Sequence, residues 1–88
     1  MAVKHIKTRT GFEMDIDDSC IDDMELLEAV ANLQNGDPYA IRIVIDKVCG
    51  DSKKALYDHC RLESGRVPTQ AVAEEINAIF EAMNAKNS

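Results

Sequence analysis

The chain has 88 residues, a mass of 9.8 kDa and a formal charge of -6, because 16 acidic residues outnumber 10 basic ones. A chain of this length makes one small domain, residues 1–88, with a single core. Its negative charge argues against binding along a nucleic-acid backbone or an anionic membrane. The longest uninterrupted apolar runs are only a few residues long, as at residues 43–45, which argues against a membrane-spanning helix.

The cysteine content indicates the compartment. Cys20, Cys49 and Cys60 are an odd number of cysteines, and the N-terminal residues lack the apolar stretch of a secretory signal. We therefore expect reduced thiols and a cytoplasmic protein.

The first 16 residues predict a β-hairpin. Apolar and polar side chains alternate in residues 3–9 and again in residues 12–16, which is the periodicity of a strand. Gly11 lies between the two segments and can adopt the positive φ that a tight turn needs. An isolated hairpin is only marginally stable, so we expect the hairpin at residues 3–16 to pack on helices.

Four helices are predicted after the hairpin, at about residues 22–34, 38–49, 52–64 and 69–84. Aspartate or serine precedes the first turn of the first three, and glycine follows each of them, at Gly36, Gly50 and Gly65. The residues that form a broad apolar face on the first helix are Met24, Leu26, Leu27, Val30, Ala31 and Leu33.

The fourth helix has the clearest amphipathic pattern. Its apolar stripe consists of Val72, Ile76, Ile79, Phe80 and Met83. We expect Glu74, Glu75 and Glu81 to lie outside that stripe. The sequence therefore predicts an α+β fold, in which an N-terminal β-hairpin is followed by four short helices around one small core, with a frayed tail at residues 85–88.

An acidic block occupies residues 11–28 and contains no Lys or Arg. Its members are Glu13, Asp15, Asp17, Asp18, Asp22, Asp23, Glu25 and Glu28. An EF-hand loop needs glycine at position 6 and glutamate at position 12. A loop starting at Asp15 would place Cys20 and Leu26 there, and one starting at Asp17 would place Asp22 at position 6. We therefore predict no calcium site and interpret the block as a solvated strand edge and helix N-terminus.

Zinc binding and catalysis would require clustered His and Cys residues. The spacing of His5, Cys49, His59 and Cys60 matches no pair of zinc ligands, and adjacent residues of a helix point about 100° apart. The chain contains neither a nucleotide-binding glycine motif nor a serine-hydrolase motif. We expect a protein without a metal, a cofactor or catalytic residues, and therefore not an enzyme.

The second and third predicted helices could form a helix-turn-helix. Five basic residues lie there: Lys47, Lys53, Lys54, Arg61 and Arg66. Four acidic residues share the stretch: Asp46, Asp51, Asp58 and Glu63. The remaining charge of about +1 is too small for the basic face of a DNA-binding module, so we predict no nucleic-acid binding.

The second helix has more apolar residues than burial of one side requires. The small size of the fold favours a central helix that is covered on two sides. Alternatively, Tyr39 and Ile43, one turn apart, extend the stripe into a patch that binds another protein. The residues that we name as candidates for a partner-binding surface are Tyr39, Ile43, Phe80 and Met83.

Six short segments carry a resemblance to a known family. They are KTRTGFEMDID at residues 7–17, DMELLEA at 23–29, GDPYA at 36–40, LYDH at 56–59, GRVP at 65–68, and EEI with IF within 74–80. Their order and spacing resemble those of the small tail assembly chaperones of long-tailed phages and prophages of Gram-positive bacteria.

The resemblance implies a non-enzymatic assembly factor that acts in the host cell cytoplasm and is absent from the mature virion. Such a protein, alone or as a homo-oligomer, binds the tape measure protein through apolar helix surfaces and helps to recruit the tail tube protein. One alternative stays open. A small acidic phage or bacterial regulatory protein could bind a host protein by charge mimicry, using residues 13–28.

Overall fold

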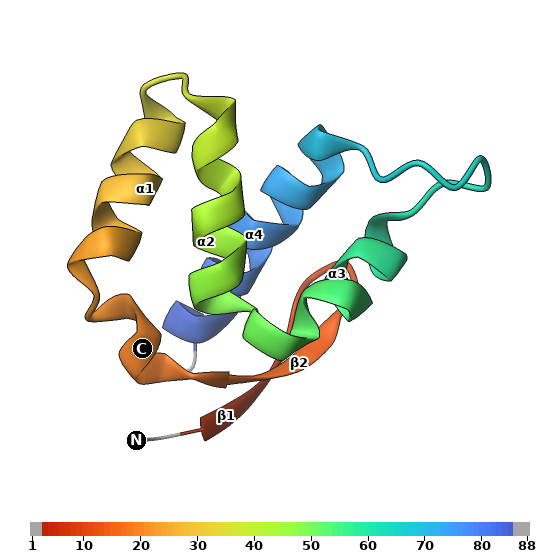
Figure 1. Cartoon of the computed structure of the whole chain (residues 1–88). Helices are drawn as coiled ribbons and strands as arrows, with labels where there is room; N and C mark the ends of the chain where they lie inside the picture. The colour runs from red at the N-terminus through yellow and green to blue at the C-terminus, as the bar shows by residue number, and fades with distance from the viewer. Residues whose placement is uncertain (1–2, 86–88) are drawn as a thin grey trace.

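The computed structural model describes residues 3–85 and contains one β-hairpin and four α-helices (Figure 1). The strands are β1 (Val3–Lys7) and β2 (Glu13–Asp17). The helices are α1 (Met24–Gln34), α2 (Ile41–Val48), α3 (Lys53–Cys60) and α4 (Thr69–Ala85). Short 3-10 helices precede three of them: η1 (Asp18–Ile21), η2 (Pro38–Ala40) and η3 (Gly50–Ser52). This element order confirms the predicted α+β fold, a hairpin followed by four helices.

The hairpin has one buried and one exposed face. Its strands pair antiparallel, with Ile6 opposite Met14. These two side chains and Ile16 are buried, whereas their neighbours within the strands, His5, Lys7, Glu13 and Asp15, are exposed, as the period-two pattern requires. Gly11 has a φ of 95° in the connecting turn, a conformation that glycine adopts without steric cost.

The core lies between the buried face of the hairpin and the helices. Helices α1 and α2 lie side by side, the hairpin lies below them in the view of Figure 1, and α4 passes behind α2. Ile6 of β1, Val44 of α2, Leu56 of α3 and Ile79 of α4 are almost completely buried in one apolar cluster. Within the described residues, no helix is both long enough and apolar enough to cross a membrane.

Helix α1 begins where the sequence predicts. The carboxylate of Asp23 accepts hydrogen bonds from the backbone N–H groups of Glu25 and Leu26, and it also pairs with Nζ of Lys47 at 3.0 Å. Since Lys47 lies at the end of α2, this ion pair joins the start of one helix to the end of the other. The two helices therefore run antiparallel.

Helix α3 ends at Cys60, four residues earlier than predicted. Arg61 is extended, with ψ at 136°, and its guanidinium donates to the carboxylate of Asp58 and to the backbone carbonyl of Gly65. Four more helical residues would bury little, because residues 61–66 are all exposed. The chain instead forms the projecting loop seen between α3 and α4 in Figure 1. Of the predicted frayed tail, Ala85 is helical and residues 86–88 lie outside the described part.

Two adjacent leucines of α1 test this account of the core. Leu26 is 2% exposed and Leu27 is 55% exposed, so truncation changes helix propensity equally at both positions but packing only at the first. We expect Leu26→Ala to lower the free energy of unfolding by about 2–5 kcal/mol. Leu27→Ala should change it by at most about 0.5 kcal/mol. Urea denaturation followed by circular dichroism measures both, and equal losses would contradict the orientation of α1.

Candidate functional site

The four candidate partner-binding residues occupy different environments. Tyr39 is 82% exposed and Ile43 is 48% exposed, so both are accessible to a partner. Phe80 is half-buried against the core, and Met83 is a core residue with 4% exposure. The structure therefore offers the first two residues as a surface and places Met83 in the interior.

Helix α2 leaves one of its sides uncovered. Ile41, Val44 and Ile45 face the core, as does Val48 at the last turn. Helix α2 has α1 beside it and α4 behind it, as the interpretation of a central helix expects, but the side that carries Ile43 is exposed to solvent.

The broad apolar face that we predicted for α1 is divided between core and solvent. Leu26 is buried, and Val30 and Leu33 pack partly against the core. In contrast, Met24 is 68% exposed, Leu27 is 55% exposed, and Ala31 is also exposed. Their spacing of three and four residues puts these last three on one side of the helix, and we call them the α1 surface.

A polar row separates the α1 surface from Tyr39 and Ile43. Nζ of Lys47, on α2, contacts the Glu25 carboxylate at 3.0 Å, so the Glu25 side of α1 is the side that faces α2. Glu28 and Asn32 follow at helical spacing on that same side, and both are exposed. The outer face of the α1–α2 pair thus carries two apolar strips with a polar row between them.

Most of the acidic block has a structural role. Asp17 accepts a hydrogen bond from the backbone N–H of Ser19 at the start of η1, Asp23 caps α1, and Lys4 pairs with Asp18 at 3.0 Å. Among residues 3–85, no three His, Cys, Asp or Glu side chains are grouped so that they could hold a metal ion.

His5 joins the two strands on the exposed face of the hairpin. Its ring nitrogens contact the carboxylates of Glu13 at 2.9 Å and Asp15 at 2.8 Å. These two hydrogen bonds, that of Glu13 first, raise the pKa of His5, and the same contact lowers the pKa of Glu13. The imidazole lies in an exposed cross-strand pair, because His5 is opposite Asp15 in the hairpin.

The three cysteines are free thiols in the structure. Burial raises the pKa of Cys49 to about 12, and burial is also the main cause of the raised pKa of Cys20 and of Cys60. The thiolate is the nucleophilic form of cysteine, so these environments disfavour thiol reactivity.

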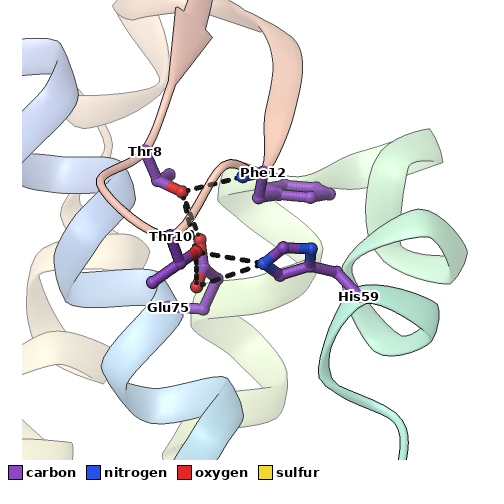
Figure 2. Close-up of polar contacts among 5 residues, drawn as sticks. All are labelled: Thr8, Thr10, Phe12, His59 and Glu75. Carbon is purple, nitrogen blue, oxygen red and sulfur yellow. Dashed lines mark hydrogen bonds and ion pairs between the residues drawn. The ribbon is translucent and has the colours of Figure 1, made fainter.

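A polar cluster around a buried carboxylate joins the hairpin turn to α3 and α4 (Figure 2). At its centre lies Glu75 of α4, which is only 4% exposed. Its two carboxylate oxygens accept hydrogen bonds from the hydroxyls of Thr8 and Thr10, each at 2.7 Å. Nε2 of His59 lies 3.0 Å from the Thr10 hydroxyl and 3.8 Å from the carboxylate.

A count of donors assigns the hydrogens in this cluster. Each threonine has one hydroxyl proton, and both protons point at Glu75. This assignment leaves the 3.0 Å contact between the two threonine oxygens without a proton and lets Nε2 of His59 donate to the Thr10 oxygen. The backbone N–H of Phe12 donates to the Thr8 oxygen at 3.1 Å. Every polar group of the cluster then has a partner, which offsets the cost of burying a carboxylate.

The prediction that Glu75 lies outside the apolar stripe of α4 is wrong. Glu75 is three residues after Val72 and four before Ile79, and this spacing places it among the buried residues. Periodicity alone could have indicated its burial. The two threonines that make burial tolerable lie more than 60 residues away in the chain and carry no local signal.

A cavity of about 350 Å³ lies beside the cluster and is lined in part by Thr10, His59, Cys60 and Glu75. Catalysis there would need an activated nucleophile. Burial raises the pKa of the Cys60 thiol beside this cavity, which disfavours its nucleophilic thiolate form. We interpret the cluster as a latch that fixes the hairpin turn against the helices, and the phenyl ring of Phe12, 5.3 Å from the imidazole of His59, closes it on one side.

Comparison of the chain with protein-family models, with curated proteins and with solved structures found no match. A proposal of function therefore depends on the short sequence motifs and on the exposed apolar strips described above.

Adjacent glutamates of α4 test the latch. Glu75→Gln replaces one acceptor oxygen by an NH₂ group, so one threonine hydroxyl loses its acceptor in a buried site. We expect a loss of about 1–3 kcal/mol in the free energy of unfolding. Glu74→Gln, at an exposed position, should stay within about 0.5 kcal/mol of the wild type. Similar stabilities of the two variants in urea denaturation would show that the latch contributes nothing.

Proposed function

We propose that this chain is a non-enzymatic phage tail assembly chaperone that binds helical segments of the tape measure protein through exposed apolar side chains. The order of the short motifs supports the family. The observation that carries the proposal is the position of the exposed large hydrophobic residues. Five of the seven in the described part of the chain lie within residues 21–43: Ile21, Met24, Leu27, Tyr39 and Ile43.

This concentration matters because scattered exposed hydrophobics are normal, whereas a group of them marks a contact surface. Full burial of one large apolar side chain contributes about 1.5–3 kcal/mol, so several half-exposed residues are enough for reversible binding of a partner helix. The net charge of -6 would keep the chaperone soluble while these side chains stay exposed.

The acidic-regulator alternative has weaker support. Charge mimicry needs acidic groups that are available to a partner, but Asp17 and Asp23 cap helices, Asp18 pairs with Lys4, and Glu13 pairs with His5. These internal contacts would have to break or be shared before the block could imitate a polyanion. Apolar docking requires no such rearrangement.

Co-expression with the tape measure protein of the same genome tests the proposal. We expect the chaperone to raise the soluble fraction of the tape measure protein and to elute with it in gel filtration. The chaperone would act as a monomer or a homo-oligomer, and the complex would also bind the tail tube protein. Met24→Gln combined with Leu27→Gln should reduce the co-eluting amount about tenfold or more, because it removes most of the exposed apolar area of α1.

The matched control combines Val3→Gln with Leu62→Gln, two exposed hydrophobics outside residues 21–43, and it should co-elute like the wild type. The proposal fails if the tape measure protein remains insoluble with the wild-type chain, or if the two double variants behave alike. Complex formation that persists at about 0.5 M salt argues for apolar docking, and its loss there argues for the acidic regulator.

A further inference from the structure

Resting on the proposed function, we infer that the segment bound by the α1 surface is an amphipathic helix that carries Lys or Arg residues beside its apolar stripe. Two features of α1 lead to this partner: the helical spacing of Met24, Leu27 and Ala31, and the charge of the residues around them.

The shape of the α1 surface fits a helix. Met24 and Ala31 are separated by two turns, a rise of about 10 Å, with Leu27 between them. Such a row forms a ridge that packs into the groove between the side-chain rows of another helix. Helices that bind this way contribute apolar residues at the same spacing of three and four.

The charge around the α1 surface is negative. No Lys or Arg occurs between Arg9 and Arg42. Asp22 precedes α1 and Glu28 lies one turn after Met24; both are exposed, and within residues 3–85 neither forms an ion pair. A partner with positive side chains next to its apolar stripe would pair with these two carboxylates, whereas an acidic partner would be repelled.

The same charges disfavour a second copy of this chain as the occupant. In a two-fold dimer the same acidic patch of both subunits meets, so Asp22 and Glu28 would lie close to the carboxylates of the other copy without a compensating cation. The strip formed by Tyr39 and Ile43 does not favour a positively charged partner in this way. Arg42 is exposed next to it, and Asp46 is already paired with Lys53 at 3.4 Å.

Two synthetic helical peptides with the same apolar stripe, one flanked by Lys and one by Glu, test the inference by fluorescence anisotropy with the full chain. We expect the Lys peptide to bind at least about tenfold more tightly than the Glu peptide at low salt, and the difference to shrink at about 0.5 M salt. Asp22→Asn combined with Glu28→Gln should weaken binding of the Lys peptide about threefold to tenfold.

The control combines Asp51→Asn with Glu63→Gln, which changes the net charge equally at two exposed positions far along the chain, and it should stay within about twofold of the wild type. Equal binding of both peptides, or equal effects of both double variants, overturns the inference. If the tape measure protein is still solubilised in that case, the proposed function stands. Sedimentation equilibrium gives a second check. If the wild-type chain is a dimer and Met24→Gln combined with Leu27→Gln makes it a monomer, the inference is also overturned, because the α1 surface then binds a second copy.

Discussion

Packing of the hairpin and the helices around one apolar cluster decides which apolar residues stay outside. Ile6 and Met14 present one apolar face, β1 packs on α4, and Val44 of α2 and Ile79 of α4 belong to the same buried cluster. Helix α1 then reaches the core with only one side, through Leu26. Its opposite side carries Met24 and Leu27, which no other element of the described chain covers. Exposed apolar surface in this molecule is thus a consequence of how few elements 88 residues can form.

The latch around Glu75 supports this arrangement. A two-stranded sheet is only marginally stable by itself, so its orientation must be fixed by contacts with helices. Thr8 and Thr10, at the end of β1 and in the turn, bind a carboxylate of α4, while His59 of α3 approaches the same group. Three elements distant in sequence thereby meet at one point. The cluster has a structural role, because its polar groups form hydrogen bonds with one another. The exposed apolar side chains of the α1 surface, in contrast, are not covered by another element of the described chain.

Local signals were sufficient for much of the fold. The glycine turn at Gly11 and the cap at Asp23 act within a few residues, so the hairpin and the start of α1 were predictable. The early end of α3 was not, because it depends on what Arg61 can contact and on the lack of core beyond Cys60. The candidate site was predictable only in part. The sequence left two alternatives for Tyr39 and Ile43, burial on a central helix or exposure as a patch, and both residues are exposed. The division of α1 into buried and exposed apolar sides was not predictable, because it depends on where the other helices pack.

The central claim is that α1 offers its apolar side to a partner, and NMR of methyl groups in the full chain tests it most directly. A soluble fragment of the tape measure protein is titrated into the labelled protein. The account predicts that the largest shifts occur at Met24 and Leu27, with little change at Thr8 and Thr10 in the latch. Shifts concentrated at the two threonines, beside the cavity lined by His59 and Glu75, with unchanged methyl signals on α1, would contradict it.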